Sequence, residues 1–315
     1  MTDTHPYSEL NSQKPFLQIV VSLFIMLLVS LIMLGLTSLL GRLIFGTQLQ
    51  EISLDNVVIT DAQRESLKFT QALQHLSMFL IPALVLAYLM NRKPFDYLGI
   101  NKISGWVTLL FVFILALVLI PLTGDLGVWN SNMQLPQWMS GLDAWMRQKE
   151  LEAGVLTGWL IRSDNLASLL LNIFVLAIIP ALGEEFLFRG ILQQIFSKIF
   201  RSGHIAILFT AILFSASHMQ FFGFLPRLLL GLVYGYLFFW SGSIWLPVLA
   251  HFINNLLPVV LAHFIGWEAL NKSVQEIFTG GDYIVLAPIF LGGLLIFGIR
   301  DQLKHPSSSE KWSPE

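Results

Sequence analysis

The sequence contains no cysteine and few charged residues among its 315 positions. Without thiols the chain can form neither disulfide bonds nor thiolate nucleophiles, and it cannot build a metal site from cysteine. Charged residues make up only 12% of the chain, about half the share found in typical soluble domains. The net charge is −2, and no stretch is strongly basic. These absences argue against a soluble domain and against nucleic acid as a partner.

Hydrophobic residues, by contrast, make up 55% of the chain and gather in long runs. A helix needs roughly 20 apolar residues to cross the hydrocarbon core of a bilayer. The sequence therefore predicts an all-α fold, a polytopic transmembrane helical bundle of about eight spans in contact with membrane lipid. The runs cover about residues 16–40, 70–90, 104–122, 166–188, 204–218, 222–240, 244–264 and 283–299, and the run that ends at His218 is the shortest.

Polar segments between these runs divide the chain into four parts. Residues 1–15 form a polar N-terminal tail, and residues 16–165 hold spans and loops without a recognised motif. Residues 166–264 form a membrane core with several polar motifs, and residues 265–315 hold the last span and a tail predicted to be cytoplasmic. Segment 41–69 is rich in charged residues and is predicted to be a solvated loop.

The longest polar connection covers residues 123–165 and contains four tryptophans. Indole rings favour the interface between bilayer and water, so we expect this segment to lie on the membrane surface. A loop packed outside the membrane is the alternative. The tryptophans are Trp129, Trp138, Trp145 and Trp159.

Lysine and arginine in the short loops predict the orientation of the bundle. With eight spans, the N-terminus, two short connections and the C-terminal tail fall on one side, and basic residues gather there. Because such residues favour the cytoplasmic side, we expect both termini in the cytoplasm. The residues concerned are Lys14, Arg92, Lys93, Lys102, Lys198, Arg201, Arg300, Lys304 and Lys311.

Two adjacent glutamates, Glu184 and Glu185, interrupt the fourth apolar run. An ionisable side chain at membrane depth costs at least ~2.5–3.5 kcal/mol, so it is typically paired and functional. Arg189 follows Glu185 by four positions and shares its helix face, which predicts an ion pair. Glu184 points about a quarter-turn away and stays free of that pair. The alternative is a structural anchor in which Arg189 ties both glutamates to neighbouring backbone.

The fourth span is expected to bend beside these carboxylates. Pro180 and Gly183 predict a kink, with the last turns of the helix continuing to about Phe200. A kink of this kind opens space and backbone groups around a site. In the predicted orientation the glutamates lie toward the cytoplasmic half of the span.

Two later segments supply imidazoles and a carboxamide. His218 ends a helix rich in small residues, with Phe214 one turn earlier on the same face. His251 and Asn255 are four positions apart and share one face of the seventh span. Taken alone, His218 is equally consistent with a helix cap, and His251 with a hydrogen-bonded packing residue.

Together these groups match the requirements for hydrolysis of an acyl bond. Glu184, helped by His218, would take a proton from water, and the hydroxide would attack a carbonyl carbon. His251 and Asn255 would donate hydrogen bonds to the developing oxyanion. The zinc-protease pattern His-Glu-x-x-His is absent from the sequence, and no glycine-framed serine motif is present.

The three motifs resemble, in order, those of a known protease family. Glu184-Glu185-x-x-x-Arg189, Phe214-x-x-x-His218 and His251-x-x-x-Asn255 are similar to the motifs of the CAAX prenyl protease type 2 family, also called the CPBP or Abi family. The resemblance covers about residues 166–260. It implies an all-helical membrane endopeptidase in which Glu184 and His218 activate water and His251 and Asn255 form the oxyanion site.

By the same resemblance, Glu185, Arg189 and Phe214 are supporting residues. The family has been described both as metalloproteases and as glutamic proteases. Glu184, His218 and His251 could ligate Zn²⁺, but we favour a metal-free reaction without a cofactor. The expected substrate is a peptide or protein cleaved near its C-terminus or close to the membrane, at the cytoplasmic face of a bacterial plasma (inner) membrane.

Two other functions compete with this prediction. A non-catalytic immunity or scaffold protein would use the same residues to hold helices together. A proton-coupled transporter would also need buried glutamate and histidine, but the sequence has no internal repeat and no paired half-helices, which are typical of transporters. Nothing in the chain points to a prenylated substrate.

Overall fold

The computed structural model describes residues 9–46, 59–272 and 283–303. Within these ranges the chain forms helices and short connections and no strand, which confirms the predicted all-α fold. The α-helices are α1 (Glu9–Ser12), α2 (Pro15–Phe45), α3 (Asp61–His75), α4 (Ile81–Met90), α5 (Pro94–Leu98), α6 (Trp106–Ser131), α7 (Ser140–Ile161), α8 (Leu166–Asn172), α9 (Ile179–Leu187), α10 (Gln193–Phe200), α11 (Gly203–Ser217), α12 (Phe224–Ser241), α13 (Trp245–Ile265) and α15 (Tyr283–Gln302).

Six helical runs in the described part of the chain are long and apolar enough to cross a membrane. A seventh apolar helix, α11, is shorter, and α15 covers the last apolar run of the sequence. Each of the eight predicted runs therefore falls on a helix, and the protein is built as an integral membrane protein. The six runs are Pro15–Phe45, Asp61–Met90, Trp106–Ser131, Leu166–Phe200, Phe221–Ser241 and Trp245–Ile265.

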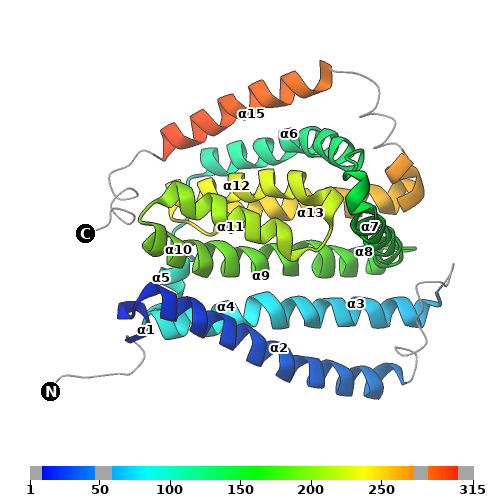
Figure 1. Ribbon diagram of the computed structural model, residues 1–315, viewed down its shortest axis with the longest axis horizontal. Coiled ribbons are helices and arrows are strands. Elements are labelled where there is room, and N and C mark those ends of the chain that lie inside the picture. The colour runs from blue at the N-terminus through cyan, green and yellow to red at the C-terminus, as the bar shows by residue number, and fades with distance from the viewer. Residues whose placement is uncertain (1–8, 47–58, 273–282, 304–315) are drawn as a thin grey trace.

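The helices pack side by side, and the two ends of the bundle carry different elements (Figure 1). One end holds α1, α5, the last turn of α10 and the red end of α15, and we call it the basic end. The other end holds α7 and α8, and we call it the α7 end. The described basic residues that predict the orientation lie at the basic end, where Lys198 donates a hydrogen bond to Asn11 over 2.6 Å.

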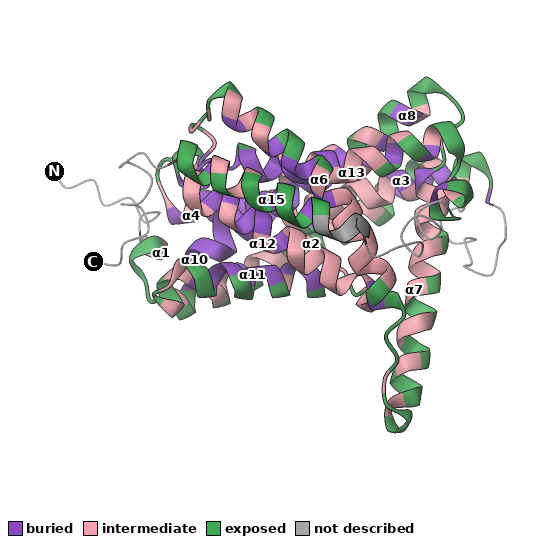
Figure 2. Ribbon diagram, turned by 90° about the horizontal axis from the view of Figure 1, so that it is seen from above, coloured by how far each residue is buried: buried purple, intermediate pink, exposed green. Residues whose placement is uncertain are grey.

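Two apolar clusters form the core, and the fourth span belongs to the first of them. That cluster joins α4 and α5 to α9 and α10 and includes Leu98 and Leu187. The second joins α6, α12 and α13 and includes Leu115 and Leu237. Figure 2 shows the buried residues gathered inside the bundle, with exposed residues on its outer faces. Helix α9, which carries Glu184 and Glu185, and helix α13, which carries His251 and Asn255, are thus packed on several sides.

The fourth span is helical from residue 166 to residue 200, and it contains two wider, π-helical turns. The first, Ile173–Ile178, comes just before Pro180, and the turn Leu76–Leu80 stands in the same relation to Pro82. Proline lacks the N–H that an α-helix needs, and a π-helical turn accommodates that defect. The bend predicted at Pro180 therefore corresponds to a widened turn in a helix that does continue to Phe200.

Close contact between the second and fourth spans depends on Gly183. A Cβ atom at this position would lie 3.1 Å from Cβ of Phe79, closer than most real Cβ contacts. Because glycine has no Cβ, α9 approaches the π-helical turn that follows α3. This approach brings the end of α3 next to Glu184.

The segment 41–69 is only partly a loop, which corrects the prediction. Residues 61–69 belong to α3, whereas residues 47–58 lie outside the described ranges. Thr60 begins α3 with a capping box, because its hydroxyl accepts from the Gln63 amide and the Gln63 side chain accepts from the Thr60 amide. A threonine followed three positions later by glutamine is a helix start signal in the sequence.

The connection 123–165, predicted to lie on the membrane surface or to form a packed loop, is mostly helical. Residues 123–131 continue α6, and α7 begins at Ser140. Pairs of opposite charge at helical spacing stabilise α7, such as Asp143 with Arg147 at 2.7 Å. Figure 2 shows part of α7 extending beyond the body of the bundle. Trp138 is 82% exposed there.

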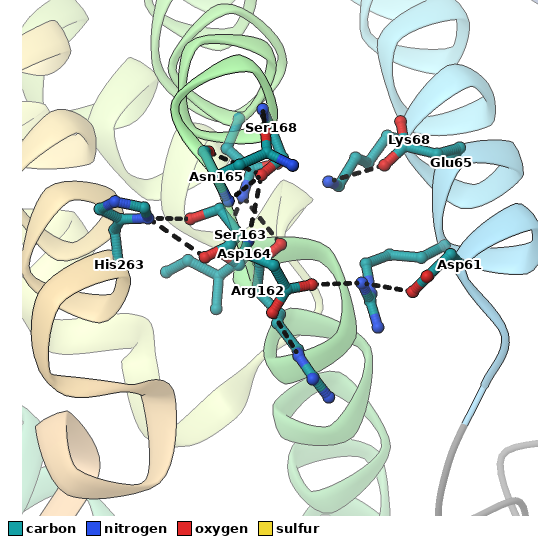
Figure 3. Close-up of polar contacts among 12 residues, drawn as sticks. Asp61, Glu65, Lys68, Arg162, Ser163, Asp164, Asn165, Ser168 and His263 are labelled. Carbon is teal, nitrogen blue, oxygen red and sulfur yellow. Dashed lines mark hydrogen bonds and ion pairs between the residues drawn. The ribbon is translucent and has the colours of Figure 1, made fainter.

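A polar network joins three helices at the α7 end (Figure 3). Arg64 of α3 contacts Asp164, which precedes α8, over 3.3 Å, and Arg162 contacts the same carboxylate over 3.2 Å. Ser163 meets His263, near the end of α13, over 2.9 Å. We call this set the α8 network. It holds the start of α3, the start of α8 and the end of α13 together.

Candidate active site

The α9 helix places Glu184 inside the bundle, where it is 3% exposed. Its Oε1 accepts a hydrogen bond from Nε2 of His75 over 3.2 Å. Its Oε2 lies 3.9 Å from Nε2 of His218 and 3.9 Å from Nε2 of His251. This oxygen has no hydrogen-bond partner among the described residues. Three imidazoles thus face one carboxylate, and two of them face the same oxygen.

Glu185 forms the ion pair that the sequence predicts. Arg189 Nη1 donates to Glu185 Oε1 over 2.9 Å, and both side chains are fully buried. The same oxygen lies 2.8 Å from Nδ1 of His251. The second guanidinium nitrogen of Arg189 donates to the Gly231 carbonyl over 3.1 Å. Glu185 therefore links the first motif to His251 of the third motif, a connection that spacing alone did not reveal.

Aromatic rings enclose the arginine and the imidazoles. The Arg189 guanidinium carbon lies 4.7 Å from the centre of the Phe214 ring and 5.4 Å from that of Tyr234. Phe214 meets the rings of His218 and His251 edge-on, at 5.1 Å and 5.9 Å. Tyr234 stacks on His251 at 5.2 Å. Phe214 thus supports three site residues at once, in line with its predicted supporting position.

His218 follows α11 directly and turns back toward the bundle. Its Nδ1 lies 2.9 Å from the Phe214 carbonyl oxygen, one helical turn earlier. Because a carbonyl only accepts, Nδ1 carries the proton. In the neutral ring, Nε2 is then an acceptor, and this atom faces Glu184. The contact with the Phe214 carbonyl resembles a helix cap, but it involves only Nδ1 and leaves Nε2 to face Glu184.

The proton positions on the other two rings follow from the same reasoning. His75 Nε2 faces a carboxylate oxygen of Glu184 and therefore carries a proton, while its Nδ1 lies 3.0 Å from the side-chain nitrogen and 3.3 Å from the backbone carbonyl of Gln71. His251 Nδ1 faces a carboxylate and therefore carries a proton. His251 can donate from Nε2 as well only when its ring is doubly protonated.

A cavity of about 390 Å³ opens beside the histidines, and we call it the inner cavity. His218, His251 and Asn255 line it, so the predicted oxyanion residues face the same space. Asn254 also lines it but donates to Tyr234 and to the Ala250 carbonyl, both over 2.9 Å. Apolar residues cover much of the remaining wall, among them Ile120, Leu230, Leu257 and Leu261.

Comparison with known protein families shows a match over the part of the chain that carries these residues. Residues 166–257 match the family model described as type II CAAX prenyl endopeptidase, Rce1-like. The chain carries an Rce1-like domain of that family. The members of this family are membrane proteases, and all seven residues predicted for the site lie inside the matched range. The resemblance recognised from the three motifs is thereby confirmed.

A curated relative matches part of the chain, and its name states no activity. The chain is 29% identical over 109 residues to the uncharacterized protein YpbD of Bacillus subtilis (strain 168), a match that covers 33% of this chain and 51% of the relative. The chain thus spans about half the length of the curated relative it matches. No solved structure matches the chain.

His75 is the site contact that the sequence analysis missed. It lies outside the Rce1-like domain, on the second span, and is separated from Glu184 by 109 positions. The only local signal was Gln71, one helical turn before it, and a glutamine–histidine pair is too common to indicate chemistry. The contact became visible only when the second and fourth spans were placed side by side.

Among the described residues, no group of three histidine and acidic side chains is arranged to hold a metal ion. In His251 and His218, the nitrogen that does not face Glu184 makes a contact of the kind seen in metal-binding histidines. Nδ1 of His251 meets the Glu185 carboxylate, and Nδ1 of His218 meets the Phe214 carbonyl. Such contacts fix the ring orientation in zinc sites. They would fix it equally well for a ring that acts on water.

Proposed function

We propose that this protein is an intramembrane endopeptidase that hydrolyses a peptide bond with water activated by Glu184 and His218. The supporting observation is the convergence of two acceptors, Glu184 Oε2 and His218 Nε2, 3.9 Å apart. That separation is too long for a direct hydrogen bond and suits a single bridging water. Each acceptor would take one hydrogen of this water, which would aim its lone pair into the inner cavity.

Glu184 is the proposed general base. It would remove one proton from the water as the oxygen attacks the carbonyl carbon, and His218 would orient the water through the other proton. When the C–N bond breaks, Glu184 would return the proton to the leaving amine. The products are a carboxylic acid and an amine, and no covalent enzyme intermediate forms. His75 would hold the Glu184 carboxylate in the required orientation.

His251 and Asn255 are the proposed donors to the oxyanion. With His251 doubly protonated, its Nε2–H and the Asn255 amide both face the inner cavity. The buried charges then balance, because Glu184 and Glu185 are offset by Arg189 and His251. Oxyanion donors of this kind typically contribute ~10²–10³ in rate each.

The position of the inner cavity indicates on which side of the membrane cleavage would occur. His218 and the parts of α6 and α13 that line the inner cavity lie toward the α7 end, away from the basic end. If the termini lie in the cytoplasm, a cavity in this position would favour cleavage away from the cytoplasmic face. We propose that cleavage occurs on the side opposite the basic end. Because the chain has no cysteine, single cysteines at Lys93 and Arg162 would report the two sides through an impermeant maleimide.

A zinc-dependent form of the same protease is the second candidate. The contacts of Nδ1 of His218 and His251 are compatible with it, and Glu184, His218 and His251 would be the ligands. Zinc would supply a Lewis acid and lower the pKa of a bound water. Metal content of the purified protein, and activity after chelation and after zinc is restored, separate the two forms.

Replacement of the proposed base tests the function. Glu184→Gln keeps the size of the side chain but removes the base, so peptide cleavage in detergent should fall by about 10²–10⁴-fold. A matched control is Glu152→Gln on α7, which should cleave normally. Normal cleavage by the Glu184 variant would end the proposal. A non-catalytic scaffold would instead show no cleavage by the wild type and a loss of thermal stability in the variant.

A further inference from the structure

A second and larger cavity lies next to the inner cavity, and the two share part of their lining. This outer cavity measures about 1610 Å³, and residues of α7 form one of its walls. Three residues line both cavities, namely Arg227, Trp267 and Asn271. Trp267 has the largest side chain of the three, so its indole ring accounts for much of the partition between the two spaces.

The position of Trp267 is fixed by the turn that precedes it and by apolar packing. Gly266 ends α13 with a φ of +83°, which favours glycine, and its N–H donates to the Ala262 carbonyl over 2.9 Å. A new helical turn then begins, in which the Leu270 N–H donates to the Gly266 carbonyl over 3.0 Å. Trp267 and Leu270 pack in one apolar cluster with Ile161, the last residue of α7. The indole is therefore anchored on the bundle.

Helix α7 leaves room for this indole at Gly158. A Cβ atom at position 158 would lie 2.8 Å from Cδ1 of Trp267, which is closer than Cβ atoms approach other atoms in proteins. Gly154, one turn earlier, also lines the outer cavity, but a Cβ there would have open space within 4 Å among the described residues. The indole thus requires a glycine at position 158 and not at position 154.

The inner cavity extends from the histidines toward Trp267. Helix α13 lines it from His251 through Pro258 and Leu261, and Trp267 follows just after the end of this helix. At about 390 Å³ the inner cavity is at the small end of the usual range for ligand pockets. An apolar group that enters beside His251 and follows this wall therefore ends against the indole.

We propose that Trp267, positioned by Gly158, forms the end wall of the inner cavity and limits the length of the apolar side chain that a substrate places there. This assignment rests on the proposed peptidase function and describes the substrate class of the same site. The substrate is a peptide with an apolar side chain beside the bond that Glu184 attacks. Without the indole, the inner cavity would open into the outer cavity, and longer side chains would fit.

A ladder of peptides measures this length in binding, separately from cleavage. Each dye-labelled peptide is blocked at both ends and carries one unbranched alkyl side chain of about two to about twelve carbons, because each CH₂ that enters an apolar pocket strengthens binding about fourfold. Binding to the Glu184→Gln protein in uncharged detergent is followed by fluorescence anisotropy. We expect the affinity to rise with chain length and to stop rising at a limit, where the chain meets the indole.

Two substitutions should move this limit in opposite directions. Trp267→Ala removes the end wall, so the affinity should go on rising by about fourfold for each further CH₂. Gly158→Ala pushes the indole toward the inner cavity, so it should weaken binding of the longest chain that the parent accepts. Trp267→Phe keeps a ring at this position and should restore part of the limit.

Matched controls are Gly154→Ala and Trp159→Ala. Gly154 lies on the same helix as Gly158, and Trp159 lines the outer cavity but not the inner one. Neither substitution should move the limit. Detergent takes up the longer chains alike in every preparation, so the difference between variants carries the result. A limit that Trp267→Ala leaves in place, or that Trp267→Ala and Gly158→Ala move in the same direction, overturns the proposal.

Two further outcomes separate the proposal from the proposed function and from a lipid. If the limit follows Trp267 but the wild type cleaves none of the peptides, the end wall stands and the peptidase function fails. A free alkyl alcohol of matching length tests whether the peptide backbone contributes to binding. If this alcohol binds as tightly as the peptide, the inner cavity belongs to a lipid chain and the peptide assignment is overturned.

Discussion

The cluster around Glu184 and the α8 network both join three parts of the bundle through acidic and basic side chains, yet their surroundings differ. Glu185 and Arg189 are completely buried. In the α8 network, by contrast, Asp164 is 56% exposed and Arg162 61%. Water can therefore satisfy the α8 network, whereas the Glu184 cluster depends on its own members. Acidic and basic side chains therefore cost more free energy in the cluster around Glu184 than in the α8 network.

The buried cluster also leaves several polar atoms without a partner in the described part of the protein. These atoms include Oε2 of Glu184, Oε2 of Glu185 and Nε of Arg189. An unsatisfied buried polar group typically costs about 1–3 kcal/mol. A purely structural anchor would gain nothing from this cost. The α8 network carries one such atom, Nε of Arg64, against the three of the buried cluster. The difference favours a chemical role for the buried cluster.

The largest expected effect comes from removing the buried cation. Arg189→Gln leaves the two buried glutamates with one negative charge uncompensated inside the bundle, and we expect a loss of about 3–5 kcal/mol in the free energy of unfolding. Denaturation in detergent, followed by far-ultraviolet circular dichroism, measures it. Changing Glu185 to glutamine as well should restore part of the loss. A loss below 1 kcal/mol would remove the contrast with the α8 network.

Those features of the fold and of the site that depend on residues close together in the sequence were predictable. Apolar runs marked the spans, and the spacing of four between Glu185 and Arg189 predicted their ion pair. The helical nature of 61–69 and 140–161 was missed because charged residues at helical spacing were interpreted as loops. The capping box at Thr60 and the pairs of opposite charge along α7 were the available signals for these helices.

Contacts between distant spans could not be predicted in the same way. His75 acquires its importance from Glu184, which lies opposite it and 109 positions away, and its local contact with Gln71 does not indicate chemistry. The bond between His251 and Glu185 crosses 66 positions. A single sequence records spacing along a helix, but it contains no direct signal for which helix faces which.

His75 gives the next prediction, on activity instead of stability. His75→Ala removes the donor to Glu184 Oε1, and we expect kcat/KM for peptide cleavage to fall about 10- to 100-fold, the range for a positioning contact of this kind. The unfolding transition should change little, because the His75 side chain is 17% exposed and lies at the edge of the core. His75→Gln should recover part of the activity, because an amide can also donate.

His204→Ala provides the control for this change. His204 meets Tyr236 over 3.0 Å at an exposed position at the start of α11, near the basic end and at the opposite end of that helix from His218. Its removal should leave kcat/KM unchanged. If His75→Ala lowered stability and activity together while His75→Gln restored neither, His75 would be a packing residue and not a positioning residue.

The smallest effect is expected in the α8 network. Asp164→Asn removes one acceptor from Arg64 and from Arg162, but Arg64 keeps Asp61 at 3.0 Å. Because these carboxylates are exposed, we expect a loss of less than about 1 kcal/mol in the free energy of unfolding.

Added salt should shrink this difference, since it screens exposed charges more than buried ones. The same salt series on Arg189→Gln should leave its larger loss nearly unchanged. A loss of several kcal/mol for Asp164→Asn that salt does not reduce would show that Arg64, itself 7% exposed, makes the α8 network behave like the buried cluster.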